Sequence, residues 1–146
     1  MEKQRVLYAN YFDELWRIKA AIAYYHRVKE IIERQARLVE EYKAAWALFR
    51  QDDHFTTEEL DYMQKVYLGI FDESIKNLDQ LALVVNAFKT QMSDAKRLEI
   101  INAVADQLEN NYSDLREFNT QNRMMSLQRA SERGDLELVK RLYGIQ

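Results

Sequence analysis

Hydrophobic residues recur along the chain at steps of three and four, with polar residues between them. Such steps place apolar side chains on one face of an α-helix. No proline or glycine interrupts residues 4–50, so one helix of about 45 residues is predicted, nearly 70 Å long, which needs a bundle around it. Its stripe consists of Leu15, Ile18, Ile22, Tyr25, Val28, Ile32, Val39, Tyr42, Trp46 and Phe49.

Two further stripes predict helices over residues 57–91 and 94–131. The first has nearly heptad spacing and consists of Leu60, Met63, Tyr67, Ile70, Ser74, Leu78, Leu81, Val85, Phe88 and Met92. The second consists of Leu98, Ile101, Ala105, Leu108, Tyr112, Leu115, Asn119, Asn122 and Met125. It becomes polar at 119–122. A buried asparagine there would fix helix register, and an exposed one would end the tight packing; we favour the second interpretation.

A short helix over residues 135–143 closes the chain. Gly134 is suited to the left-handed residue that ends the preceding helix, and Asp135 can cap the next one. Ser93 is the candidate N-cap of the helix before. The patterns together predict one domain, residues 1–146, with an all-α fold: an elongated antiparallel three-helix bundle with a short C-terminal fourth helix.

The stretch RQDDHFTTEELDYM, residues 50–63, connects the first two helices. It fails as an EF-hand calcium loop, because a loop that starts at Asp52 places His54 at position 3 and Thr57 at position 6, where glycine is required. As a corner it satisfies helix-start rules. Thr56 and Glu59 form a capping box, and Phe55 can pack on Leu60 as a hydrophobic staple.

Composition agrees with long helices and narrows the function. The chain has no proline, three glycines and no cysteine, which excludes disulfides and cysteine-based zinc sites. Residues 1–50 carry ten Lys/Arg against seven Asp/Glu, residues 51–92 three against eight, and residues 93–146 eight against nine, which gives +3, −5 and −1. The net charge of −3 gives no general attraction to nucleic acid. No apolar run approaches the roughly 18 residues of a membrane span, and the start has no signal-peptide pattern.

The residues that carry enzyme chemistry are scarce. The two histidines, His26 and His54, lack the Glu-x-x-His spacing of di-iron bundles, and we interpret them as a bundle-edge residue and a loop residue. No serine lies in a G-x-S-x-G elbow. We therefore expect no catalytic, cofactor-binding or metal-binding residues, no cofactor and no small-molecule substrate.

Four aromatic residues near the start are the candidate partner-binding site. If residues 57–91 fold back on the first helix, they reach only to about residue 16, so earlier residues would project beyond the bundle. A projecting aromatic cluster indicates a partner or self-association surface. It consists of Tyr8, Tyr11, Phe12 and Trp16.

Several landmarks carry a family resemblance: FTTEEL at 55–60, DESIKNLDQL at 72–81, SDAKRLEII at 93–101, YSDLREF at 112–118 and RLYG at 141–144. Their order resembles the helical conjugal-transfer proteins of Bacteroidales mobile elements (conjugative transposons), which are similar in outline to minor-pilin-like subunits of type IV secretion systems. The resemblance implies a non-enzymatic component of a mating apparatus that contacts other apparatus proteins or itself. It places the protein in the periplasm or cell envelope if a signal peptide was removed upstream, and otherwise we expect the cytoplasm. The alternative is a cytoplasmic nucleic-acid-binding or regulatory protein that uses the basic face of residues 1–50, whose interspersed acids disfavour it.

Overall fold

A computed structural model describes residues 6–11, 26–86 and 92–146 of the chain, and these residues form helices and no strand. The helices are α2 (His26–Gln51), α3 (Thr57–Asn86), α4 (Asp94–Arg133) and α5 (Leu136–Leu142). Residues 6–11 form one more helical segment. The all-α prediction is confirmed, and the starts of α3 and α4 coincide with the predicted starts at residues 57 and 94.

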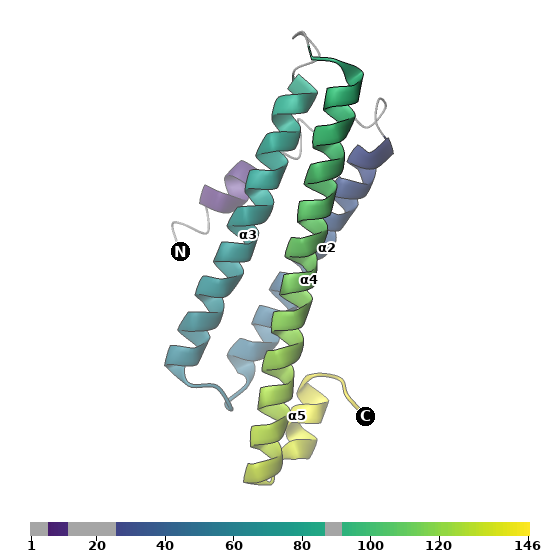
Figure 1. Cartoon of the computed structure of the whole chain (residues 1–146). Coiled ribbons are helices and arrows are strands. Elements are labelled where there is room, and N and C mark those ends of the chain that lie inside the picture. The colour runs from purple at the N-terminus through teal and green to yellow at the C-terminus, as the bar shows by residue number, and fades with distance from the viewer. Residues whose placement is uncertain (1–5, 12–25, 87–91) are drawn as a thin grey trace.

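The helices α2, α3 and α4 run side by side in alternating directions and give the molecule an elongated shape (Figure 1). α4 packs along both α2 and α3, and α5 folds back against the end of α4 (Figure 1). This is the predicted antiparallel three-helix bundle with a short C-terminal helix. We use the term corner end for the end that holds residues 52–56 and α5. None of the helices in the described part of the chain is both long and apolar enough to cross a membrane.

The caps explain where the helices begin and end. The Thr56 hydroxyl accepts a hydrogen bond from the Glu59 backbone N–H at 3.1 Å, and the Glu59 carboxylate accepts one from the Thr56 N–H at 3.0 Å, which is the predicted capping box. Ser93 caps α4 through the Lys96 N–H. Gly134 ends α4 with φ of 83°, a left-handed conformation that glycine adopts without a steric cost.

Three buried polar pairs join the helices across the core. Gln35 donates to the Ser74 hydroxyl at 3.0 Å, and Asn77 donates to Asn111 at 2.7 Å. Tyr67 donates to Asn119. Because each pair joins two helices, it favours one register between them.

Asn119 and Asn122 contradict the interpretation favoured from sequence. Both are buried, at 6% and 8% exposure. Asn119 accepts the Tyr67 hydroxyl, and the Asn122 side chain donates to the Phe118 carbonyl at 3.0 Å. The polar stretch of the third stripe therefore continues the tight packing, and the expectation that it would end the packing is wrong.

The prediction of one straight helix over residues 4–50 is also wrong. In such a helix Tyr11 and Tyr42 would lie about 46 Å apart along the axis. Instead both contact Phe71 of α3, with ring centroids 5.7 Å and 6.2 Å away. Residues 6–11 therefore lie beside α2 and α3, and burial of aromatic surface on Phe71 outweighs continuation of the helix.

Candidate functional site at the corner end

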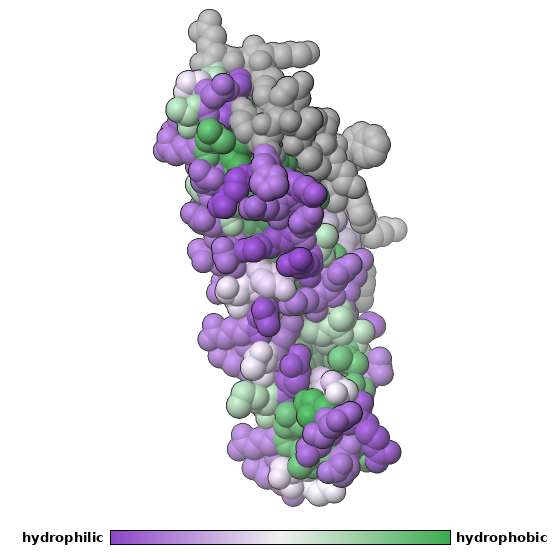
Figure 2. Space-filling model, turned by 90° about the vertical axis from the view of Figure 1, so that its right-hand side faces the viewer, coloured by the Kyte–Doolittle hydropathy of each residue, from purple (hydrophilic) through white to green (hydrophobic). Residues whose placement is uncertain are grey.

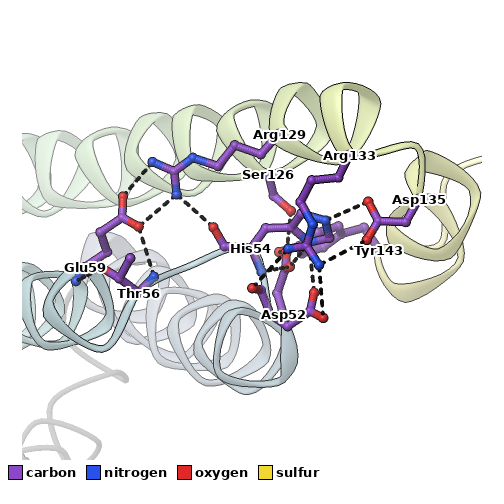
Figure 3. Close-up of polar contacts among 10 residues, drawn as sticks. Asp52, His54, Thr56, Glu59, Ser126, Arg129, Arg133, Asp135 and Tyr143 are labelled. Atoms are coloured by element: carbon purple, nitrogen blue, oxygen red, sulfur yellow. Dashed lines mark hydrogen bonds and ion pairs between the residues drawn. The ribbon is translucent and has the colours of Figure 1, made fainter.

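The most concentrated chemistry in the described residues lies where the α2–α3 corner meets α4 and α5 (Figure 3). Side chains from four parts of the fold point toward one another there. We call them the His54 cluster, defined by Asp52, His54, Ser126, Asp135 and Tyr143. The corner supplies the first two residues, α4 the serine, and the turn into α5 and its end the last two.

Asp52 is the acceptor at the centre of the cluster. It is 3% exposed, and its Oδ1 accepts from the His54 backbone N–H at 3.0 Å and from the His54 Nδ1 at 2.7 Å. Its Oδ2 accepts from the Tyr143 hydroxyl at 2.5 Å and from the Ser126 hydroxyl. Burial raises the pKa of Asp52, but the hydrogen bonds from Ser126, Tyr143 and His54 outweigh burial and leave the pKa below its ordinary value.

Three carboxylates surround the His54 ring. Its Nδ1 is 2.7 Å from Asp52 and 3.2 Å from the exposed Asp53, its Nε2 is 2.9 Å from Asp135, and its side chain is 2% exposed. A carboxylate can only accept, so both ring nitrogens donate only when the ring is the imidazolium. Burial lowers the pKa of His54, but the hydrogen bonds to Asp135 and Asp52 raise it above the ordinary value. His54 is therefore a buried positive centre that the carboxylates of Asp52, Asp53 and Asp135 surround.

Two arginines of α4 bind the rim of the cluster. Arg129 forms a bidentate pair with Glu59, with both N–O distances 2.8 Å, and donates to the His54 carbonyl at 2.8 Å. The hydrogen bonds from Arg129 and Thr56 lower the pKa of Glu59 to about 2. Arg133 lies 3.7 Å from both Asp53 and Asp135. The first helical turn of α3 is thus fixed to the last turns of α4.

Asp52, Asp53 and His54 also have the side-chain types of a metal site, with potential ligand atoms within 4.8 Å of one another. A tetrahedral Zn²⁺ with bonds of about 2.0–2.2 Å keeps neighbouring ligand atoms about 3.3 Å apart. The 2.7 Å between His54 Nδ1 and Asp52 Oδ1 is a hydrogen-bond distance. The distance fits a shared proton between these two atoms better than it fits a metal ion. The hydrogen bonds of the His54 cluster hold α4 and α5 against the corner.

The four aromatic residues proposed from sequence are not brought together as a projecting surface. Tyr11 is buried at 4% exposure, and Tyr8 packs on Phe71 at 5.1 Å and lies under the Lys43 ammonium group. The overhang expected for these two tyrosines is therefore wrong, because both lie against the bundle. Phe12 and Trp16 lie outside the described residues.

Sequence reasoning treated the two histidines separately and missed the His54 cluster. His26 is at the bundle edge as expected, with a side chain 86% exposed. His54 is in the corner as expected but is buried, because Ser126, Asp135 and Tyr143 approach it from 72 to 89 residues further along the chain. The one local signal was the Asp-Asp-His sequence before the capping box. No protein-family model, curated protein or solved structure matches this chain.

We expect stability to fall with rising pH because of His54. A histidine whose pKa is raised by folding contributes stability that is fully present below its unfolded pKa, about 6.5, and that is lost as the pH rises through the folded value. Urea unfolding from about pH 5.5 to about pH 9.5 should show this decline in the native chain and a flatter profile in His54→Gln.

His26→Gln is the matched control, because the His26 side chain is 86% exposed and pairs with the exposed Glu30 at 3.8 Å. It should keep the decline of the native chain. Equal pH profiles for His54→Gln and the native chain would contradict a charged His54.

Proposed function

We propose that this protein is a non-enzymatic, protein-binding component of a bacterial conjugative DNA-transfer apparatus of the type IV secretion kind, at the cell envelope. Two things support the proposal: the resemblance to conjugal-transfer helical proteins, and the distribution of apolar side chains on the surface. The elongated bundle suits a part that bridges or positions other subunits.

The observation that carries the proposal is a set of large apolar side chains exposed at the corner end. Tyr62 of α3 is 63% exposed, Met124 of α4 is 64% exposed and Leu138 of α5 is 61% exposed. Figure 2 shows hydrophobic side chains gathered at the lower end of the molecule, where α5 lies. Exposed apolar surface of this kind marks protein contact sites, and methionine adapts readily to a partner's shape.

The basic face of α2 supports protein contacts over nucleic-acid binding. Arg27 and Arg34 lie 3.9 Å and 3.2 Å from Asp106 and Glu109 of α4, respectively. Both arginines therefore face acidic side chains within the bundle. A phosphate backbone would have to compete with these carboxylates, which weakens the alternative of a nucleic-acid-binding protein.

The test is capture of mating-apparatus subunits from conjugating donor cells by the tagged, full-length chain after crosslinking. We expect the triple variant Tyr62→Ser, Met124→Ser, Leu138→Ser to lose capture by about tenfold or more, because interface energy is concentrated in a few anchoring side chains. Leu83→Ser is the control, because Leu83 is 71% exposed but lies near the other end of α3.

Equal capture by the triple variant and the native chain would reject the corner end as the contact surface. Capture of no apparatus subunit by the native chain would reject the proposed function. DNA binding that weakens steeply with salt would favour the alternative.

A further inference from the structure

A groove runs between α2 and α4, next to the place where α5 packs. Its volume is about 320 Å³, and Ala44, Ala45 and Leu48 of α2 form one side, while Arg116, Thr120 and Arg123 line it from α4. We call it the α2–α4 groove. Its α2 side presents methyl and isobutyl groups together with the Glu41 side chain, and its α4 side carries two guanidinium groups and Asn119.

The groove continues directly into a place that already holds a helix. The α4 residues of the groove end at Arg123, and Ser126, one turn further, belongs to the His54 cluster with Tyr143 of the α5 C-cap. Tyr143 packs on Phe49 of α2 with ring centroids 5.9 Å apart. Arg123 lies close enough to Tyr143 to oppose the rise in that phenol's pKa. The α2–α4 face thus receives α5 at the corner end and leaves the groove beside it open.

The arginines of the groove differ from the other arginines that α4 carries. Arg97, Arg129 and Arg133 each lie within 4.0 Å of a carboxylate. Among the residues that the structure describes, no carboxylate lies within that distance of Arg116 or Arg123, and Arg116 lies over the Tyr112 ring, 5.8 Å from its centroid.

The acidic residue beside them is already engaged. The carboxylate of Glu41 accepts the Tyr112 hydroxyl at 2.5 Å. Glu41 also lines the groove, so the formal charges of Arg116, Arg123 and Glu41 give the lining a net charge of +1.

We propose that the α2–α4 groove binds an acidic amphipathic helix of a partner protein, an inference that rests on the proposed protein-binding function. Arg116 and Arg123 are seven residues apart, about 10.5 Å along α4. A partner helix that runs along α4 repeats at the same interval, so two of its carboxylates seven residues apart can meet both arginines. Its apolar face would then cover Ala44 and Leu48 beside the buried Ala45, and the alanines are small enough for close approach.

The same features disfavour a nucleic-acid backbone. Phosphate groups would not cover the alanine and leucine side chains, so that apolar surface would stay exposed to water and contribute no hydrophobic binding energy. A helix with one acidic and one apolar edge matches both sides of the groove.

The probe is a synthetic helical peptide of about 20 residues, with glutamates seven residues apart beside a leucine and alanine face. Its binding to the full-length, isotope-labelled protein is followed by two-dimensional NMR at up to about 100 µM. We expect shifts to centre on Ala44, Ala45, Leu48 and Thr120, and affinity to weaken between about 50 and 300 mM salt. A matched peptide with glutamine in place of the two glutamates should bind about tenfold more weakly.

Variants separate the charge of the groove from its shape. Arg116→Gln with Arg123→Gln should weaken peptide binding about tenfold, whereas Lys29→Gln with Lys65→Gln, which removes the same charge from exposed positions outside the groove, should not. Ala44→Trp should block the groove, whereas Ala103→Trp, exposed on α4 outside the groove, should leave binding unchanged. Circular dichroism verifies that each variant is folded.

Absence of peptide binding, or equal binding by Ala44→Trp and the native chain, would overturn the proposal. Tighter binding of a single-stranded oligonucleotide than of the acidic peptide would overturn it in favour of nucleic acid, and shifts in the groove without peptide that grow with protein concentration would overturn it in favour of self-association. These failures are distinct from failure of the proposed function. Apparatus subunits captured equally by Ala44→Trp and the native chain would reject the groove alone.

Discussion

Asp52→Ala is expected to lower the free energy of unfolding by about 3–5 kcal/mol, because it removes one partner of a buried ion pair. The substitution removes the acceptor of four hydrogen bonds at once, from the His54 N–H, the His54 ring, Ser126 and Tyr143. It leaves the His54 imidazolium with Asp135 and the exposed Asp53 as its counterions. Urea unfolding near neutral pH measures the change, and amide hydrogen exchange should show α5 opening first.

Asp53→Ala is the matched control in the neighbouring position. The Asp53 carboxylate lies 3.2 Å from His54 Nδ1 and 3.7 Å from Arg133. Because its side chain is 76% exposed and solvent screens both contacts, its loss should cost less than about 1 kcal/mol. Because folding lowers the pKa of Asp52, the stability that its carboxylate provides is present above about pH 3.9 and is lost as the pH falls through the folded value. Equal unfolding energies for the two variants would contradict the central role of Asp52.

The features that sequence predicted correctly are those that depend on neighbours within one or two helical turns. The steps of three and four predicted most of the buried stripe of α2, α3 and α4, but Leu98 and Met125 are exposed and the buried Phe71 was not on the predicted stripe. The Thr56–Glu59 pair and Ser93 predicted two helix starts to the residue. Each of these signals is contained within a few residues, so no knowledge of the rest of the chain is needed to interpret it.

The reversal between residues 6–11 and α2 could not be predicted in the same way. Residues 4–50 contain no proline, no glycine and no clear cap, so their local pattern fits a continuous helix. What decides against it is the packing of Tyr8 and Tyr11 on Phe71, about 60 residues further along the chain. Tertiary burial of this kind overrides local propensity.

The burial of Asn119 and the formation of the His54 cluster could not be predicted from the sequence, for a related reason. A polar residue on a helix stripe has two outcomes, burial with a partner or exposure, and the partner decides between them. Tyr67 lies 52 residues before Asn119, and Asp135 lies 81 residues after His54. Histidine and aspartate in a loop are ordinarily solvated, so only the fold reveals that these are enclosed. Asp135 occupies the N-cap position of α5, as predicted, but its side chain makes no cap hydrogen bond there and contacts His54 instead.

Phe71→Ala is expected to have an effect as large as that of Asp52→Ala, through a different mechanism. Phe71 is 1% exposed, and its ring centroid lies 5.1, 5.7 and 6.2 Å from those of Tyr8, Tyr11 and Tyr42, respectively. Truncation leaves a cavity and removes three ring contacts, at a cost of about 3–5 kcal/mol. Residues 6–11 lose their aromatic anchor on α3, so their amides should exchange with solvent faster than those of α2 and α4.

Two variants separate cavity formation from loss of the anchor. Tyr11→Ala should accelerate exchange in residues 6–11 with a smaller loss of global stability, because it leaves the packing of Phe71 on Tyr42 in place. Leu83→Ala, at a position 71% exposed on the same helix, should change stability by less than about 0.5 kcal/mol. If Phe71→Ala left exchange in residues 6–11 unchanged, their attachment would have to come from contacts other than this ring. The reversal of the chain would then need a different physical cause from the burial of Tyr8 and Tyr11.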